Sequence, residues 1–145
     1  MILLDSNVLL YASNLAASEH ERARAWLQRT LVAERIGLPW VSLWSFLRIA
    51  TNARLFPRPI PAREAFAEIR TWLESPSVTV VQPGPRHVEI LEKLVTEYQA
   101  SGPLVSDAVL AAIAIEYGAI LASTDNDFRR FPTLRWINPL ESATK

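Results

Sequence analysis

Short apolar runs alternate with segments of helical periodicity along the whole chain, and this alternation limits the possible folds more than any other feature. The strand candidates, which are aliphatic or β-branched, are residues 2–4, 37–41, 78–81, 119–122 and 134–137. The helix candidates between them are residues 8–12, 18–32, 42–52, 62–73, 85–98 and 106–117. Strands that alternate with helices predict an α/β fold, with a parallel sheet covered by helices on both faces.

Helix ends are predicted from capping residues and from breaks. Ser18 followed by Glu21 has the spacing of a capping box, which predicts a helix that begins at Ser18. Gly118 is expected to end the helix at residues 106–117. Prolines break the loop at residues 53–61, and Gly-Pro at residues 102–103 is expected to separate two helices.

The size and composition of the chain predict one ordinary globular domain, residues 1–145. Half of its 145 residues are hydrophobic and none is cysteine, so disulfides, thiolate metal sites and thiol nucleophiles are excluded. Any metal ligand must be an oxygen atom or one of two histidines, His20 and His87. Acidic and basic residues balance at 15 each, so any RNA contact must be local. No stretch is long and apolar enough to span a membrane, and we expect a cytoplasmic protein.

All four aspartates of the chain occupy positions where a parallel sheet brings polar groups together. Asp5 directly follows the first strand candidate, and Asp125 follows the fourth. Asp107 is expected in the first turn of the buried helix at residues 106–117, and Asp127 lies two residues after Asp125. Carboxylates gathered at one edge of a sheet repel one another unless a cation lies between them, and short aspartates suit Mg²⁺ or Mn²⁺. The sequence therefore predicts one acidic metal site.

Each of these residues also has a purely structural explanation. Asp5 could form an Asx turn at a strand end, Asp107 could cap a helix, and Asp127 could cap the turn before Phe128. A structural account of all four aspartates needs four coincidences, which favours the metal site. Three polar neighbours could either orient metal ligands and water or satisfy loop backbone, namely Ser6, Asn7 and Ser123.

Four segments of the chain, taken together, resemble the PIN domain of VapC-type toxins from bacterial toxin–antitoxin pairs. They are LLDSNVLLYA near the start, SFLRIATNARLF in the middle, SDAVLAAIAIEYGA, and STDNDFRRFP near the end. The resemblance implies a three-layer α/β/α sandwich with a five-stranded parallel sheet. It also implies a Mg²⁺- or Mn²⁺-dependent endoribonuclease that acts on transfer or ribosomal RNA. The implied partners are a VapB-type antitoxin and a second copy of the chain, in a homodimer.

The same resemblance assigns the acidic residues and reveals one departure. Asp5, Asp107 and Asp125 match the family's catalytic metal positions, and Asp127 matches the aspartate of its terminal D-F pair. In many members the middle motif reads E-F-L-R, but here Ser45 stands in place of the glutamate. Ser45 can hold a water through its hydroxyl but brings no charge, so weaker metal binding is expected. A catalytically weak PIN scaffold that acts through protein binding is therefore the alternative function.

Arginine and tryptophan side chains are the candidates for RNA contact. The phosphate candidates are Arg48, Arg129 and Arg130, although the last two could simply be solvated charges. Four tryptophans could stack on RNA bases, receive an antitoxin helix or fill the core, namely Trp26, Trp40, Trp44 and Trp72.

Overall fold

The computed structural model describes residues 1–141. In chain order its elements are β1 (Ile2–Leu4), α1 (Ser6–Ser13), α2 (His20–Ala33), β2 (Ile36–Pro39), α3 (Trp40–Ala50), α4 (Ala62–Glu74), β3 (Val78–Val81), α5 (His87–Glu97), α6 (Pro103–Glu116), β4 (Ile120–Ala122), the 3₁₀ helix η1 (Asn126–Arg130) and β5 (Trp136–Ile137). Of the helices in these 141 residues, none has the length and apolar character that crossing a membrane requires.

The five strands form one parallel sheet in the order β3-β2-β1-β4-β5, which confirms the predicted five-stranded parallel sheet. In the central strand, Leu3 pairs with Gly37 of β2 on one side and with Leu121 of β4 on the other. The chain builds the sheet outward from β1 through β2 to β3, then returns to place β4 on the opposite side of β1. The strand order therefore reverses between β1 and β4, where open parallel sheets usually bind ligands.

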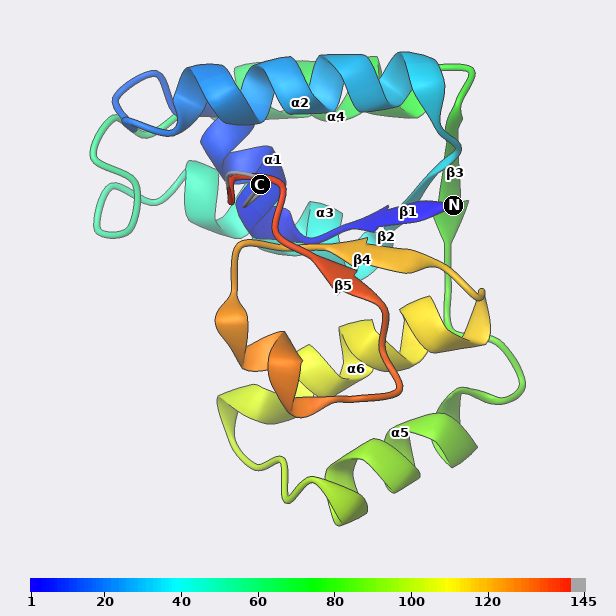
Figure 1. Ribbon diagram of the computed structural model, residues 1–145. Helices are drawn as coiled ribbons and strands as arrows, with labels where there is room; N and C mark the ends of the chain where they lie inside the picture. The colour runs from blue at the N-terminus through cyan, green and yellow to red at the C-terminus, as the bar shows by residue number, and fades with distance from the viewer. Residues whose placement is uncertain (142–145) are drawn as a thin grey trace.

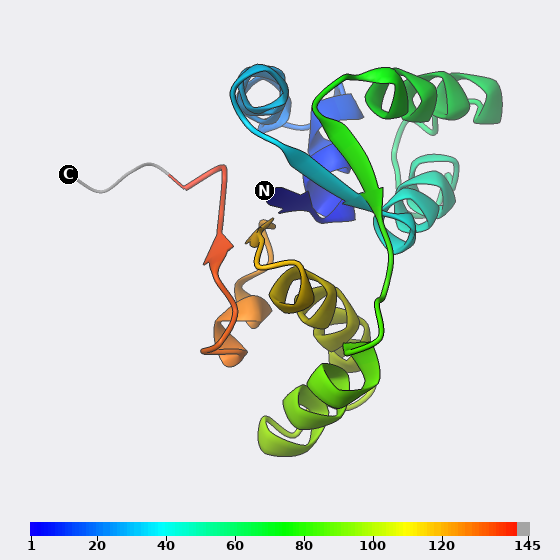
Figure 2. The same cartoon turned by 90° about the vertical axis from the view of Figure 1, so that its right-hand side faces the viewer.

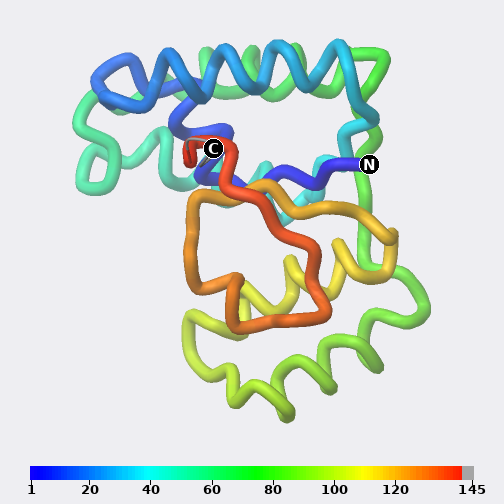
Figure 3. The backbone as a smooth tube through the Cα atoms, in the orientation of Figure 1, coloured from blue at the N-terminus to red at the C-terminus, as the bar shows by residue number. Residues whose placement is uncertain are grey.

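Two helical layers cover the sheet, as expected for an α/β/α sandwich. Figure 1 shows α1, α2, α3 and α4 on one side of the strands and α5 with α6 on the other. Figure 2 shows the same three layers from the side, with α5 and α6 below the sheet. The backbone trace in Figure 3 shows that the chain in β1 and β4 runs toward the edge of the molecule that also carries η1. The layers thus leave this edge of the sheet to loops and helix ends.

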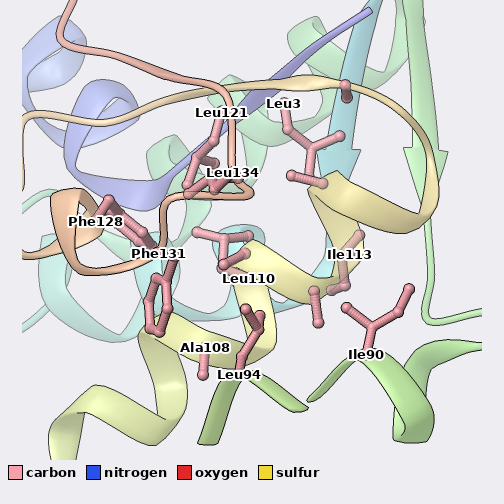
Figure 4. Packing of buried hydrophobic residues seen from close by; sticks show 14 of the residues in the cluster. Leu3, Ile90, Leu94, Ala108, Leu110, Ile113, Leu121, Phe128, Phe131 and Leu134 are labelled. Atoms are coloured by element: carbon pink, nitrogen blue, oxygen red, sulfur yellow. The ribbon is translucent and has the colours of Figure 1, made fainter. Parts of the chain in front are cut away.

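Each helical layer encloses its own hydrophobic core, because side chains alternate between the two faces of a strand. In β1, Leu3 packs on the α5–α6 side, whereas Leu4 packs on the side of α1 to α4. Figure 4 shows the first of these cores, where Phe128 and Phe131 lie beside α6. Phe128 is 1% exposed, and it anchors η1 to the sheet edge.

Five of the six predicted helix starts differ from the observed ones by two or three residues, and two of these differences bear on the sequence argument. Helix α2 begins at His20 with Glu19 as its N-cap, and no side chain caps it, so the capping box at Ser18 does not form. Helix α6 begins at Pro103, three residues before the predicted start. Proline is acceptable at the first helical position because that N–H has no partner within the helix. As a result Asp107 lies in the second turn of α6, and the first turn holds no acidic residue.

The C-terminal end of α6 is tied to the loop between β3 and α5. The two carboxylate oxygens of Glu116 accept hydrogen bonds from the backbone N–H groups of Gly84, at 2.8 Å, and Arg86, at 2.9 Å. The hydroxyl of Tyr117 donates to the carbonyl of Gln82 at 3.1 Å. A Cβ atom at Gly84 would lie 2.5 Å from the Glu116 carboxylate, so this contact needs glycine. Gly118 then ends the helix region at φ +63°, as predicted.

Candidate metal centre

Two adjacent parallel strands deliver Asp5 and Asp125 to the same edge of the sheet. Asp5 directly follows β1 and caps helix α1, where one carboxylate oxygen accepts the N–H of Ser6 at 2.7 Å. Its own backbone N–H donates to the carbonyl of Ala122, the last residue of β4, at 3.0 Å. Asp125 follows β4 after two residues. Both aspartates therefore lie where the strand order reverses, as the sequence predicted from their positions.

Ser123 links these two strand ends. Its side chain is fully buried, and its hydroxyl donates to the Asp5 carboxylate at 2.7 Å. The same hydroxyl oxygen accepts the side-chain amide of Asn7, at 3.0 Å, and the backbone N–H of Asp125, at 3.1 Å. The Asn7 amide also reaches Asp5, at 3.3 Å, and its carbonyl oxygen accepts the N–H of Thr124 at 3.2 Å. We call this network the Ser123 hub, consisting of Asp5, Asn7, Ser123 and the backbone of residues 124–125.

Asp107, Asp125 and Asp127 form the closest group of carboxylates in the part of the chain that the structure describes. One oxygen from each lies within 4.8 Å of the others. The 3₁₀ helix η1 brings Asp127 into the group. Asp125 is the N-cap of η1, and its carboxylate accepts the N–H of Asp127 at 2.9 Å. Asp125 therefore caps the turn before Phe128, and Asp127 does not take that alternative role.

Asp107 faces the strand ends from α6, across a small cavity of about 160 Å³. The cavity lies between α3 and α6, and its lining includes Asp5, Ser45, Arg48 and Asp107. Ser45, the residue that stands in place of a glutamate, therefore borders the same space as two of the aspartates. Arg48, one helical turn further along α3, is the cation at this cavity.

Burial and mutual repulsion change the acidity of two aspartates. Burial raises the pKa of Asp5, while hydrogen bonds from Ser123 and Ser6 oppose the increase. Burial, and after it the negative charges of Asp125, Asp5 and Asp127, together raise the pKa of Asp107 to about 6. Because like charges raise the cost of ionisation, the centre is a place where a cation would be bound favourably.

Two residues at the cavity were not predicted from the sequence as part of the site. Ser42 is buried, and its hydroxyl donates to the carbonyl of Leu4 at 2.7 Å, which fixes the first turn of α3 against the end of β1. Ser106 lines the cavity beside Asp107. For Ser42, a serine in a largely apolar helix was the available signal, because a buried hydroxyl needs a specific hydrogen-bond partner.

The three candidate phosphate-binding arginines have different surroundings. Arg48 lines the cavity. Arg129 lies over the ring of Trp136, 5.4 Å from its centre, and 3.6 Å from the carboxylate of Glu141, so it has partners away from the acidic group. Arg130 donates to the carbonyl of Tyr98 at 3.4 Å, and its charge lowers the pKa of Asp107. Of the three candidates, Arg48 therefore borders the centre through the cavity, and Arg130 acts on it by lowering the pKa of Asp107.

The four tryptophans divide into core and surface residues. Trp72 is buried and meets Phe46 edge to face at 4.9 Å, and Trp26 packs partly buried against the same core. Trp40 and Trp44 are exposed on α3, with ring centres 6.4 Å apart. Only the second pair is available to a ligand among these four.

The side chains at this centre fit a hard divalent cation. Every candidate ligand is a carboxylate or hydroxyl oxygen, the type that Mg²⁺ and Mn²⁺ prefer. The two histidines lie on other elements, His20 at the start of α2 and His87 at the start of α5. The spacing of Asp107, Asp125 and Asp127 would let one ion contact all three. Asp5 is not a member of this group of three and belongs to the Ser123 hub.

Comparison with known proteins matches the chain to one family model and to several curated relatives. The family model of the PIN domain matches residues 2–134. Ribonuclease VapC37 of Mycobacterium tuberculosis is 43% identical over 140 residues, which cover 96% of this chain and 97% of that protein. Ribonuclease VapC33 of the same organism is 44% identical over 141 residues, with coverage of 97% and 99%.

Solved structures show the same fold at low sequence identity. VapBC2 from Rickettsia felis, bound to a DNA fragment from its promoter, matches with a TM-score of 0.71 and 18% identity, over 95% of this chain and 98% of the other. VapC20 from Mycobacterium tuberculosis, a toxin that cleaves the sarcin–ricin loop, matches with a TM-score of 0.64 and 20% identity, over 89% and 93%.

Proposed function

The chain belongs to the PIN domain family and is a relative of the VapC ribonucleases, and from this premise we propose that its acidic centre hydrolyses RNA phosphodiester bonds with Mg²⁺ or Mn²⁺. The observation that carries the proposal is the group of three carboxylates within 4.8 Å of one another, at the point where the strand order reverses. Carboxylates in this arrangement suit metal-assisted attack of water on a phosphate.

The residues of the centre take distinct roles in this proposal. Asp107, Asp125 and Asp127 would hold the metal ion, with Asp5 as a further ligand or as the acceptor that orients water. A bound divalent ion supplies positive charge for the attacked phosphate and the leaving oxygen. The Ser123 hub holds Asp5 in place. Arg48, at the cavity, would contact a phosphate of the substrate.

The proposal extends to partners through the names of the related proteins. Structures with the same fold include complexes of VapB-type antitoxins with VapC toxins, from Rickettsia felis and from nontypeable Haemophilus influenzae. We therefore propose that this chain is the toxin of such a pair, inhibited by a VapB-type antitoxin, and that it forms a homodimer. We also propose that its substrate is transfer or ribosomal RNA and that it acts in the cytoplasm.

Ser45 supports a second candidate, a catalytically weak PIN scaffold. A glutamate at this position of α3 would add a third negative charge to the cavity that Asp5 and Asp107 line. The hydroxyl of Ser45 adds none, so the centre holds its ion with fewer charges. The scaffold differs from the enzyme in one respect that can be measured, because it binds a partner without cleaving RNA.

Cleavage of labelled transfer and ribosomal RNA by the full chain tests the proposal. We expect cleavage with Mn²⁺ that stops with EDTA. Asp107→Asn should reduce the rate by about 100-fold, because losing about 3 kcal/mol of metal-dependent stabilisation costs a factor of ten for each 1.36 kcal/mol. Glu92→Gln, an exposed acid on α5, is the matched control and should cleave normally. A folded wild-type protein that cleaves nothing in ample Mn²⁺ would contradict the enzyme and support the scaffold.

A further inference from the structure

An exposed aromatic pair lies on α3, the helix that also carries Ser45 and Arg48 of the acidic cavity. Trp44 is 65% exposed and Trp40 is 37% exposed. They are one helical turn apart, with ring centres 6.4 Å apart and an angle of 22° between the ring planes. Large apolar side chains held in water near one another mark a surface that binds something. The two parallel rings offer flat faces to a ligand.

The chain around this pair is positively charged. No acidic residue occurs between Glu34 and Glu64, whereas the stretch from the pair to the start of α4 contains Arg48, Arg54 and Arg58. All three arginines are exposed, and the salt bridges found within residues 1–141 involve none of them. The whole chain is neutral, so this is a local concentration of positive charge.

The loop at residues 51–61 presents its arginines from an ordered backbone. The side-chain oxygen of Asn52 accepts the N–H of Arg54 at 2.9 Å, and its backbone carbonyl accepts the N–H of Phe56 at 2.8 Å. Phe56 is only 4% exposed, and Ile60 donates to the carbonyl of Ala50 at 2.8 Å. Because the loop is held at both ends and by a buried ring, binding a ligand costs little ordering entropy.

This surface is continuous with the acidic centre. Arg48 follows Trp44 by one turn of α3 and lines the cavity that Asp5 and Asp107 also line. Figure 1 shows the loop after α3 and η1, which carries Asp127, on the same side of the molecule, and Figure 2 shows that they are separated in depth. A polymer bound at the cavity can therefore continue along α3 onto the loop.

We propose that Trp40, Trp44, Arg54 and Arg58 form a docking surface for a single-stranded segment of the RNA substrate next to the cleaved phosphate. Bases would stack on the tryptophan rings, and phosphates would contact the arginines. The inference rests on the proposed nuclease function. Aromatic faces combined with unpaired arginines favour RNA, because an apolar protein partner alone would leave the arginines without counter-charges. We call these four residues the α3 docking surface.

Binding of a fluorescein-labelled, single-stranded RNA of mixed sequence tests the proposal. Anisotropy is measured in EDTA with the full chain, so that cleavage does not interfere. Trp44→Ala should weaken binding roughly tenfold, whereas Trp44→Phe, which keeps an aromatic face, should stay within about twofold. The matched control is Phe66→Ala, since Phe66 is 45% exposed on α4 and should not contact RNA. Melting temperatures show that each variant is folded.

The arginines are tested through the salt dependence of the same binding. Arg54→Ala with Arg58→Ala should lower the slope of log K against log salt by about 1.4, since each phosphate contact with a single strand contributes about 0.7. Arg29→Ala with Arg70→Ala removes two exposed arginines from α2 and α4 and should leave the slope unchanged.

Three results would overturn the docking surface. The first is no binding of the RNA by the wild type, and the second is binding by the variants with unchanged affinity and slope. The third is a change in the oligomeric state of Trp44→Ala, measured by light scattering, at unchanged RNA affinity, which would show that a second copy of the chain covers the surface. None of these results affects Mn²⁺-dependent cleavage by the wild type, whose absence would instead contradict the proposed function.

Discussion

The two halves of the acidic centre are held by different forces. On the β1–β4 side, Asp5 accepts hydrogen bonds from Ser6, Asn7 and Ser123, so its charge is compensated by fixed donors. On the α6–η1 side, the hydrogen bonds within residues 1–141 include none to the Asp107 carboxylate, which instead faces other aspartates. The β1–β4 half is a hydrogen-bonded network, and the α6–η1 half is a group of negative charges that repel one another.

This difference indicates which half of the centre depends on a metal ion. Hydrogen bonds formed within the chain stabilise the β1–β4 half whether or not a cation is bound. The α6–η1 half gains its full stability only when a cation reduces the repulsion among Asp107, Asp125 and Asp127. The first half is therefore expected to contribute to folding, and the second to ligand binding.

Metal binding should have the largest effect and should act through the α6–η1 half. Mn²⁺ at about 100 times its Kd should stabilise the fold by about 2.7 kcal/mol, which raises the melting temperature by roughly 5–10 °C. Asp107→Asn should remove most of this increase, and Glu92→Gln should retain it. Calorimetry with and without EDTA measures both. An undiminished increase in Asp107→Asn would show that the ion binds elsewhere.

Ser123→Ala tests the β1–β4 half and should have the next largest effect on stability. The substitution leaves the Asp5 carboxylate and the Asp125 N–H without their buried partner, which should cost about 2 kcal/mol of unfolding free energy even without metal. Urea unfolding in EDTA provides the measurement, and the exposed Ser101→Ala is the control. If stability changed only when metal was present, the two halves would not be separable in the way described.

Ser45→Glu should add a negative charge to the centre from a third element, helix α3. A carboxylate at this position of the cavity should tighten Mn²⁺ binding about tenfold, or 1.4 kcal/mol, because metal affinity increases with the number of charged ligands. Isothermal titration calorimetry measures the change, and Ser45→Ala should bind as the wild type does. Unchanged affinity in Ser45→Glu would show that the centre does not extend to α3.

Asp107 should give the smallest effect, which appears in the pH dependence of the metal-free protein. Its pKa is raised from 3.8 to about 6, so the folded protein retains a proton that the unfolded chain releases. The stability that this proton contributes is fully present below about pH 3.8 and is lost as the pH rises through about 6. Asp107→Asn should therefore be about 1 kcal/mol more stable than the wild type at pH 7.5, less than the full 1.36 kcal/mol per pKa unit because solvent partly screens the carboxylate.

Urea unfolding of both proteins in EDTA at pH 5 and pH 7.5 provides this measurement. The stability of the wild type should decrease between the two pH values by more than that of Asp107→Asn. Glu92→Gln, whose carboxylate lies on the exposed side of α5, should follow the wild type. An equal decrease in Asp107→Asn would mean that repulsion at α6 does not limit the stability of the metal-free protein.

Two of the five strands were predicted more accurately than the helix starts, whereas the predicted second strand ran two residues too far, into Trp40 and Val41 of α3. Residues 2–4 and 78–81 have the predicted bounds because buried parallel strands are continuous apolar runs with polar residues at their ends. Helix starts depend on which backbone N–H groups find partners, and that depends on the tertiary contacts of the first turn. The start of α6 at Pro103 illustrates this, because Gly102 has φ +56° and lets the chain turn directly into the helix.

The grouping of the aspartates could be predicted, but their order within the group could not. Parallel strands end at one edge, so Asp5 and Asp125 had to lie close together once the sheet order was known. The sequence suggested Asp127 as an outer member, whereas the structure places its carboxylate with those of Asp107 and Asp125. That placement depends on η1, a single 3₁₀ turn that lacks a distinctive sequence pattern.

The contact between Glu116 and the loop at Gly84 gives this protein a control point far along the chain from its chemistry. Helix α6 carries both this anchor, at its last residue, and Asp107, nine residues earlier, so we expect a change at the anchor to shift Asp107. Substitutions at positions 84 and 116 are therefore expected to change activity while the four aspartates stay unchanged. The same two positions suit the construction of temperature-sensitive alleles, in which heating loosens the helix before the rest of the domain unfolds.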